Sequence, residues 1–385
     1  MFCYLDNAAT TKPSENVVEA VNHVMIEEFG NPSSLHGLGV NAERIIKESK
    51  ANILKLVKDR DGDILFTSGG TESNNLALLG AARAHARLGK HIITTSIEHK
   101  SVLNACKQLE EEGFEISYLK VDNNGIIDFE DFKSKLRDDT ILVSIMHVNN
   151  ETGSIQPVEL IGQYISKLKK KPIYHIDAVQ SFSKLRVSQK SILFDLLSIS
   201  GHKVYAPKGI GALYMKKGTK LKALVFGGQQ GSGIRPGTEN ILGITGINQS
   251  IKDLSKDINE NYENVSVVKK RFLSELKSKE IQYEINCDVD NASPYIVNLS
   301  FDSIRGEVLL HSLEADKIFV STGSACNSAN KLYSHVLTEM KMSESMMEGA
   351  IRFSFSTNTT KEEIDYAVEK IAYHVNYLLS ITRRK

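Results

Sequence analysis

Lys203 is the residue whose type and position point most directly to chemistry. It closes the stretch Ser200–Lys203, which follows the apolar run 194–199 and so falls at the end of an expected strand. An amine whose charge is suppressed by burial or by nearby cations can form a Schiff base with an aldehyde cofactor. The alternative is an ordinary solvated loop lysine, and the residues that accompany Lys203 decide against it.

A carboxylate falls at the end of a second expected strand, because Asp177 directly follows the run Pro172–Ile176. The carboxyl ends of neighbouring parallel strands meet at one edge of a sheet, so Asp177 and Lys203 are expected to lie there together. A Schiff-base lysine and an aspartate on the pyridinium nitrogen are the recurring pair in pyridoxal phosphate enzymes. Gln180 is either a helix-start residue or a donor to the ring oxygen of that cofactor.

A glycine turn at Gly69 and Gly70 joins the expected strand 64–67 to an expected helix. Glycines let backbone N–H groups approach a phosphate, and a helix N-terminus adds unpaired donors and the positive end of its dipole. Thr71 fits either this anion site or a plain helix cap. The chain contains neither G-x-G-x-x-G nor G-x-x-x-x-G-K-[ST], so a nucleotide is not the favoured ligand.

Two more polar residues follow expected strands. His99 comes after residues 91–96, where an imidazole could stack on a planar cofactor and exchange protons, or face solvent at a helix start. Asn150 comes after residues 141–148 and could bind a carboxylate or a phenolic oxygen, or serve as a turn residue.

The C-terminal part of the chain adds a thiol and a guanidinium. Cys326 lies among small and polar residues, which favours an exposed thiol, although reactivity also requires a lowered pKa. Arg352 lies in an alternating strand pattern, and we expect it to bind a substrate carboxylate rather than a structural one. Thr238, in the glycine-rich segment 226–240, either contacts a phosphate or caps a helix.

The composition is that of an ordinary globular protein without net charge. The 385 residues contain 47 Lys plus Arg and 47 Asp plus Glu, so we expect no binding of nucleic acid or of an anionic membrane. The N-terminus lacks signal-peptide features and no apolar run reaches the ~18 residues of a membrane span, which predicts a cytoplasmic protein. Cys3, Cys106 and Cys287 are expected to be small buried residues rather than disulfide partners.

Apolar runs alternate with helical periodicity between residues 60 and 216, which predicts an α/β fold with a mainly parallel sheet. The seven expected strands are residues 64–67, 91–96, 115–120, 141–148, 173–177, 196–200 and 211–216. Later strands and a final helix, opened by a capping box at Thr360 and Glu363, predict a smaller α+β unit. The later strands are residues 295–301, 318–322 and 350–356. We therefore predict a large domain at 15–255 and a small domain formed by 1–14 and 256–385.

The order of these motifs resembles the cysteine desulfurases of the NifS/IscS-like group, in the class V aminotransferase branch of the fold-type I pyridoxal-phosphate-dependent transferases. The resemblance extends over nearly the whole chain. It is carried by motifs at residues 5–11, 30–34, 67–75, 98–100, 147–153, 175–180, 200–203, 235–240, 324–326 and 351–354.

The resemblance implies how the cofactor is held. Lys203 would carry pyridoxal 5'-phosphate as a Schiff base, Asp177 would bind the ring nitrogen, and His99 would stack on the ring as acid or base. Gln180 would bind the phenolic oxygen. The phosphate would be held by Gly70, Thr71, Ser200 and His202. The protein would be a homodimer, in which Thr238 of the partner subunit completes the phosphate site.

The resemblance also implies the reaction. L-cysteine would become L-alanine, with Asn150 and Arg352 on the substrate carboxylate and the freed Lys203 as the base at Cα. Cys326 would take the sulfur as a persulfide and pass it to an acceptor protein, either an iron–sulfur scaffold or a thiolation enzyme. The segment after Cys326 lacks the proline of the usual family loop, a departure that bears on the choice of acceptor.

Other functions remain open on the sequence. A selenocysteine lyase or a class V aminotransferase would share Lys203 and Asp177, although Cys326 argues against the aminotransferase. A non-catalytic sulfur-relay subunit would have lost part of the catalytic set, which is intact here. A metal hydrolase using His175, Asp177 and His202 lacks a recognised ligand spacing.

Overall fold

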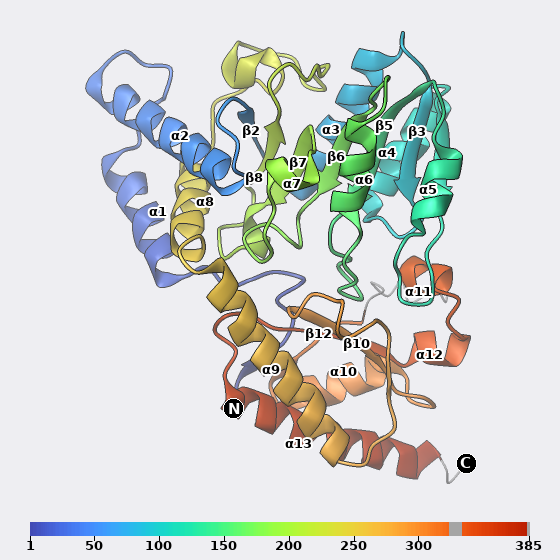
Figure 1. Ribbon diagram of the computed structural model, residues 1–385. Helices are drawn as coiled ribbons and strands as arrows, with labels where there is room; N and C mark the ends of the chain where they lie inside the picture. The colour runs from blue at the N-terminus through green and yellow to red at the C-terminus, as the bar shows by residue number, and fades with distance from the viewer. Residues whose placement is uncertain (323–332, 383–385) are drawn as a thin grey trace.

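The computed structural model describes residues 1–322 and 333–382, and its centre is a seven-stranded sheet (Figure 1). The strand order is β2-β8-β7-β6-β5-β3-β4. β8 runs antiparallel to both of its neighbours and the other pairs are parallel, so the predicted mainly parallel sheet is confirmed. The strands are β2 Asp63–Thr67, β3 His91–Thr95, β4 Glu115–Leu119, β5 Thr140–Met146, β6 Ile173–Asp177, β7 Leu196–Ser200 and β8 Gly211–Met215.

Helices cover both faces of this sheet, which explains why β3, β5 and β7 are buried along their whole length. Side chains of α3 and α4 form the apolar cluster on one face, and those of α2, α5, α6 and α8 belong to the cluster on the other. The helices of this part are α1 Glu15–Glu27, α2 Gly37–Leu56, α3 Gly70–His85, α4 Lys100–Glu111, α5 Phe129–Lys135, α6 Val158–Ser166, α7 Gln189–Ile192 and α8 Ile241–Leu254.

A second group of elements lies below the sheet in Figure 1 and has an apolar cluster of its own. It contains a three-stranded antiparallel sheet in the order β12-β10-β9 and the parallel pair β1-β11. Its strands are β1 Cys3–Tyr4, β9 Glu284–Ile285, β10 Ile296–Ser300, β11 Ile318–Phe319 and β12 Ala350–Ser354. Its helices are α9 Ile258–Ser278, α10 Gly306–Ala315, α11 His335–Glu339, α12 Glu344–Glu348 and α13 Lys361–Thr382.

The first strand, β1, and Leu5 after it pack with this second group and not with the large sheet. Cys3 pairs with Ile318 in the β1-β11 ladder, and Leu5 shares an apolar cluster with Phe272 and Phe353. The N-terminus accordingly lies beside α13 in Figure 1. The domain boundaries at residues 14/15 and 255/256 stay a prediction.

The expected strands agree with the observed ones to within two residues at nearly every end, and the capping box of α13 is confirmed. Its Thr360 N–H donates to Glu363 Oε2 at 2.8 Å, and the Glu363 N–H donates to Thr360 Oγ1 at 3.2 Å. The Cys3, Cys106 and Cys287 thiols are buried and unpaired, as expected. Within the described ranges, no helix combines the length and the apolar character that crossing a bilayer requires.

Candidate active site

The residues singled out in the sequence meet in one cavity of about 400 Å³ at the carboxyl ends of the sheet strands. This location is the usual ligand site of open α/β sheets, because each strand end delivers a loop to the same edge. Side chains from the N-terminal segment and from β12 close it from the other side. The predicted residues along its wall are Gly70, Thr71, His99, Asn150, Asp177, Gln180, Ser200, His202, Lys203 and Arg352.

Lys203 ends a short 3₁₀ turn, Gly201–Lys203, that directly follows β7. Its Nζ donates to the carbonyl oxygens of Ala8 and Ala9 at 2.6 and 2.7 Å, so the N-terminal segment holds the amine inside the cavity. Burial and the nearby Arg352 guanidinium lower the pKa of Lys203 to about 8. The amine is therefore unprotonated much more often than that of an ordinary lysine.

Asp177 is the last residue of β6 and is almost completely buried. One carboxylate oxygen accepts from Asn74 Nδ2 at 2.7 Å and the other from the Val179 N–H at 2.9 Å. Burial raises the pKa of Asp177, and no cation among the described residues lies within ion-pair distance of it. A buried carboxylate in this situation favours a cationic ligand group, since the ligand charge would offset its desolvation.

His99 stands at the N-cap of α4, where its ring nitrogen Nδ1 accepts from the Ser101 N–H at 3.1 Å. The same nitrogen lies 2.8 Å from Ser101 Oγ. The helix start thus fixes the imidazole beside the cavity, and burial is the main cause that lowers the pKa of His99.

The turn before α3 leaves no room for a side chain at Gly70. A Cβ atom there would come 2.8 Å from Val179 Cγ2 and 3.4 Å from the Cβ of Ser200. Thr71 follows at the start of the helix, where the first N–H groups have no partner within the helix. These features fit a phosphate that approaches the backbone closely.

His202, beside Lys203, also lines the cavity. Its Nδ1 lies 3.3 Å from Thr10 Oγ1. Burial together with the charge of Lys203 lowers the pKa of His202 to about 4, so the ring is neutral at neutral pH. A neutral imidazole can donate one hydrogen bond to an anion and accept another.

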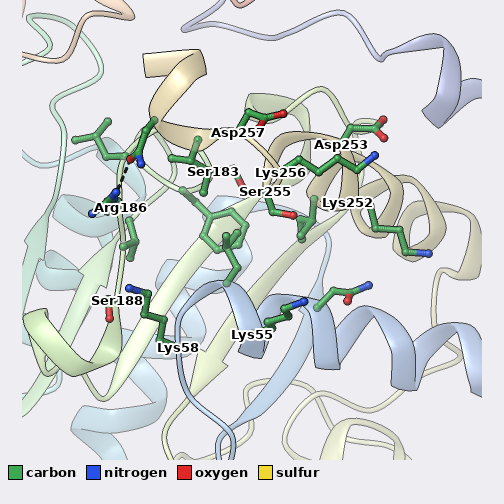
Figure 2. Close-up of a pocket in the computed structure, with 18 of the residues that line it drawn as sticks. Lys55, Lys58, Ser183, Arg186, Ser188, Lys252, Asp253, Ser255, Lys256 and Asp257 are labelled. Carbon is green, nitrogen blue, oxygen red and sulfur yellow. Dashed lines mark hydrogen bonds between the residues drawn. The ribbon is translucent and has the colours of Figure 1, made fainter. Parts of the chain in front are cut away.

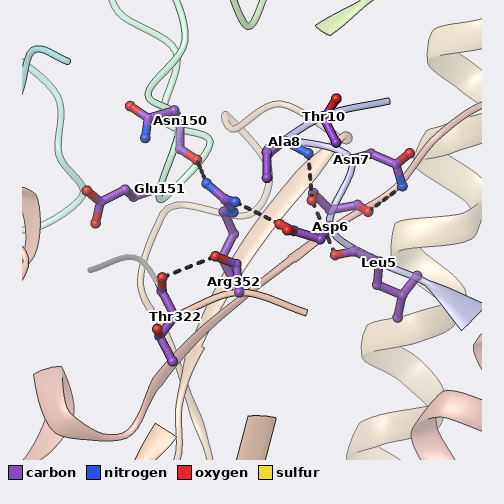
Figure 3. A network of polar contacts seen from close by, with 12 residues as sticks. Leu5, Asp6, Asn7, Ala8, Thr10, Asn150, Glu151, Thr322 and Arg352 are labelled. Atoms are coloured by element: carbon purple, nitrogen blue, oxygen red, sulfur yellow. Dashed lines mark hydrogen bonds and ion pairs between the residues drawn. The ribbon is translucent and has the colours of Figure 1, made fainter. Parts of the chain in front are cut away.

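Arg352 extends from β12 into the cavity while its neighbours Ile351 and Phe353 lie in the core, which confirms the alternation expected for this strand. Its Nη2 lies 2.8 Å from Asp6 Oδ1, and its Nη1 donates to the Asn150 carbonyl oxygen at 2.8 Å (Figure 3). A structural carboxylate therefore pairs with Arg352, and binding of a substrate carboxylate stays a prediction. The buried Nε–H has no hydrogen-bond partner among the described residues.

Gln180 is fixed by one end of its amide. Its Nε2 donates to the Ala8 carbonyl oxygen at 2.9 Å, the oxygen that also accepts from Lys203. Its Oε1 is buried without a partner in the described part of the chain. Asn150 also lines the cavity and contacts Arg352 through its backbone carbonyl.

Two predicted residues are not in this cavity. Thr238 lines a separate hollow of about 160 Å³ together with Thr67, Ser68 and Arg235. Cys326 lies outside the described residues, so its predicted role is carried by the sequence alone.

Several residues that shape the site were not predicted from the sequence. Asn74 and Ser101 connect Asp177 to His99, Asp6 pairs with Arg352, and Ala8 receives two side-chain donors. Asp6 and Ala8 belong to the motif at residues 5–11, for which the family resemblance implies no role. Asn74 belongs to the motif at residues 67–75, but residues 71–75 are all polar, so its residue type does not single it out.

A larger groove of about 990 Å³ lies elsewhere, where the C-terminal end of α2 meets the segment after β6 and the α8–α9 junction (Figure 2). Its labelled charged residues are Lys55, Lys58, Arg186, Lys252, Asp253, Lys256 and Asp257. The groove contains none of the residues that the sequence assigned to chemistry. The smaller cavity is the candidate active site because it combines a lysine of lowered pKa, a buried carboxylate and a histidine.

The residues of the cavity fit pyridoxal 5'-phosphate. The buried Asp177 lacks a cation that a pyridinium nitrogen would supply, and Lys203 has the lowered pKa that Schiff-base formation needs. Gly70 provides a cradle that any Cβ would fill. The unpartnered Gln180 Oε1 and Arg352 Nε show that polar groups remain available for a ligand.

The metal-hydrolase alternative is not supported by the geometry. His175 is fully buried and uses both ring nitrogens on Ser144 and Ser198, at 2.8 and 2.9 Å. Burial lowers the pKa of His175 to about 3. In the ranges that the structure covers, no group of three or more His, Cys, Asp or Glu side chains could hold a metal ion.

Known proteins resemble this chain over almost its whole length. The family described as aminotransferase class-V matches residues 3–367. A putative cysteine desulfurase IscS 1 of Bacillus subtilis (strain 168) is 43% identical over 370 residues, which are 96% of this chain and 97% of the relative. A solved NifS-like protein superposes with a TM-score of 0.91 at 34% identity, covering 98% of this chain and 100% of the other. The structure titled "SspA in complex with cysteine" superposes with a TM-score of 0.82 at 34% sequence identity, covering 93% of this chain and 100% of the other.

Proposed function

The chain belongs to the class V aminotransferase family, and from that premise we propose that it is a pyridoxal-5'-phosphate-dependent cysteine desulfurase. The reaction is the conversion of L-cysteine to L-alanine with transfer of the sulfur to an acceptor. The observation that carries the proposal is the single cavity that brings together Lys203, Asp177, His99 and Arg352. The relatives named as cysteine desulfurases and the cysteine-bound SspA structure support the choice of substrate.

The cofactor would be held at both of its ends. Lys203 would bond its aldehyde carbon, Asp177 its ring nitrogen, and Gly70, Thr71, Ser200 and His202 its phosphate. When bound, pyridoxal phosphate supplies an electron sink that makes the Cα proton of an amino acid removable. Asp177 assists by keeping a positive charge favourable at the ring nitrogen, because its own carboxylate is buried without a cation.

The substrate would be oriented by its carboxylate. Arg352 already has a fixed position, because Asp6 and the Asn150 carbonyl hold both of its Nη atoms, and its Nε–H is free of partners among the described residues. The Lys203 amine is the base for the Cα proton, since its lowered pKa keeps it unprotonated often enough to act. His99 is a second proton-exchanging group at the same wall.

Cys326 would be the sulfur acceptor within the chain. Its thiolate attacks the substrate sulfur, so that one S–S bond forms while the Cβ–S bond of cysteine breaks. The electron pair of the broken bond stays on carbon, which is protonated to give the methyl group of alanine. Cysteine plus thiol thus gives alanine plus persulfide without an external oxidant or reductant.

A homodimer would complete the site, with Thr238 of each chain reaching the phosphate in the other. Thr238 lies outside the Lys203 cavity of its own chain, which supports this arrangement. The exposed apolar side chains of α1, of the segment after it and of the first turn of α2 offer a surface for the partner copy. They are Val18, Met25, Ile26, Phe29, Leu35, Leu38 and Val40.

The acceptor of the sulfur is proposed to be a protein, either an iron–sulfur scaffold or a thiolation enzyme. The relatives named IscS favour the scaffold, and the absence of net charge in the whole chain speaks against direct nucleic-acid binding. We place the protein in the cytoplasm, where reduced thiols persist.

The visible absorbance spectrum tests the function. Purified protein supplied with pyridoxal phosphate should be yellow, change its spectrum with L-cysteine, and release alanine and, with a reductant, sulfide. Lys203→Ala should abolish the band, whereas Cys326→Ser should keep the band and lose sulfide release. Cys287→Ala removes a buried thiol outside the cavity and serves as the control. A colourless wild-type protein would overturn the proposal.

A further inference from the structure

Four side chains form a continuous hydrogen-bonded chain from the bottom of the cavity to its wall. Asn74 Nδ2 donates to Asp177 Oδ2 at 2.7 Å and to Ser101 Oγ at 2.9 Å. Ser101 Oγ in turn lies 2.8 Å from His99 Nδ1. Asn74, Ser101 and Asp177 are all buried, so water does not compete for these bonds.

The direction of each bond follows from what its atoms can do. The Asp177 oxygen accepts, so the amide of Asn74 must present its NH₂ group, and the second hydrogen of that group goes to Ser101 Oγ. The Ser101 hydroxyl therefore accepts from Asn74 and has its own hydrogen left for His99 Nδ1. The chain of donors runs from Asn74 outward in both directions.

The backbone N–H of Ser101 determines which tautomer the His99 ring adopts. The Ser101 N–H, which can only donate, points at His99 Nδ1 from 3.1 Å. His99 Nδ1 thus receives two donors and cannot carry a proton without opposing both of them. In the neutral ring the proton consequently sits on Nε2.

The charged groups around the ring affect whether it is neutral or positively charged. Lys203, which follows β7, and Lys100 on α4 both disfavour a positive imidazolium, while Asp177 on β6 favours it. Burial is the largest influence and acts in the same direction as the two lysines, so the pKa of His99 is lowered despite Asp177. A second proton on Nδ1 would in addition face the Ser101 N–H.

We propose that Ser101 and Asn74 are positioning residues that hold His99 as its Nε2–H tautomer, so that His99 exchanges protons in the site only through Nε2. This inference rests on the proposed function in one respect only, which is the reaction that the proton exchange serves. Asn74 also ties the orientation of His99 to the carboxylate of Asp177. The same carboxylate that would bind the cofactor ring therefore fixes the proton of the histidine beside it.

Nitrogen-15 NMR of the histidine-labelled protein tests the tautomer without any turnover. The His99 signal, identified by its loss in His99→Gln, should show a protonated Nε2 and an unprotonated Nδ1 at neutral pH. In Ser101→Ala one donor to Nδ1 is lost, and the pKa of His99 should rise by about half to one unit. Ser101→Thr keeps the hydroxyl and should restore the wild-type value.

The controls distinguish a failure of the His99 tautomer assignment from a failure of the proposed desulfurase function. Ser134→Ala removes an exposed hydroxyl bonded to the Asp131 carbonyl and should leave the His99 titration unchanged. In the holoenzyme, the acid limb of alanine release should move to higher pH in Ser101→Ala with little change in KM. A proton on Nδ1 in the unmutated protein, or an unshifted titration in folded Ser101→Ala, would overturn the assignment. Absence of alanine from wild-type protein would instead contradict the desulfurase function.

Discussion

Arg352 Nη2 and Asp6 Oδ1 lie 2.8 Å apart although 346 residues separate them in the chain. The pairing of Asp6 with Ser354, the last residue of β12, brings the N-terminal segment to this position. The Ser354 hydroxyl accepts from the Ala8 N–H at 2.8 Å. The same segment offers the Ala8 carbonyl oxygen to Lys203. The N-terminal residues, which Figure 3 shows beside the guanidinium of the site, therefore connect it with the Lys203 amine.

Replacing Asp6 by asparagine should weaken substrate binding. The variant removes the charge that orients Arg352, and a hydrogen bond between charged groups contributes about 1.5–3 kcal/mol, so KM for L-cysteine should rise about tenfold to a hundredfold. The turnover number should change much less, because the hydrogen bonds that hold Lys203 and Asp177 do not involve Asp6. Steady-state alanine release measures both constants.

Asp365→Asn is the matched control for this variant. Asp365 forms a similar ion pair with Arg271, but on the exposed surface, where such pairs contribute little. Its KM should equal that of the wild type. An Asp6→Asn enzyme with normal KM would show that Arg352 does not depend on this carboxylate.

The reaction of the cofactor-free protein with pyridoxal phosphate should depend on pH through Lys203. Because the pKa of Lys203 is lowered to about 8, the unprotonated fraction rises about tenfold per pH unit below that value and levels off above it. The rate of appearance of the visible band should follow the same curve. Arg352→Gln removes the neighbouring cation that helps to lower this pKa, so its curve should move to higher pH. A rate that is flat from about pH 6 to about pH 9 would contradict this account of Lys203.

Much of this site was accessible from the sequence, because its principal residues each follow a strand. Lys203, Asp177 and His99 stand directly after or near the ends of buried apolar runs, and parallel strands bring such positions to one edge. The glycine at position 70 was visible for a similar reason, since a strand–glycine–helix pattern is local. Local patterns thus predicted most of the fold and the wall of the cavity.

Contacts between distant segments could not be predicted in the same way. Nothing near Asp6 in the sequence indicates Arg352, and nothing near Ala8 indicates that two side chains donate to its carbonyl. Asn74 lies one turn inside α3, where its orientation depends on how the helix packs against β6. Such contacts depend on tertiary packing, which a motif does not encode.

Glu98→Gln should stabilise the protein, and increasingly so as the pH rises. Glu98 is fully buried, and burial raises its pKa to about 8 from the value near 4.5 of the unfolded chain. Between these two pH values the folded state therefore binds more protons than the unfolded state. Stability of the wild type therefore falls with rising pH in this window. Glutamine keeps an acceptor for Thr95 Oγ1 and the Met146 N–H without a charge.

Thermal unfolding at several pH values checks the prediction for Glu98. The two proteins should unfold at similar temperatures near pH 5, and the variant should gain up to a few kcal/mol relative to the wild type near pH 8. Glu112→Gln, at a surface ion pair with Arg83, should show no such gain across this window. A constant difference between Glu98→Gln and the wild type at all pH values would contradict the assigned titration.

Gly70→Ala should weaken retention of the cofactor while the fold persists. Its Cβ would come 2.8 Å from Val179 Cγ2, closer than packed carbon atoms tolerate, and overpacking of this kind costs about 1–3 kcal/mol. The strain falls on the turn assigned to the phosphate, so the dissociation constant of pyridoxal phosphate should rise about tenfold or more. Gly37→Ala is the control, because Gly37 likewise begins a helix but a Cβ there meets nothing within 4 Å. Equal cofactor affinity in the two variants, measured by absorbance titration, would mean that the phosphate does not approach the backbone at Gly70.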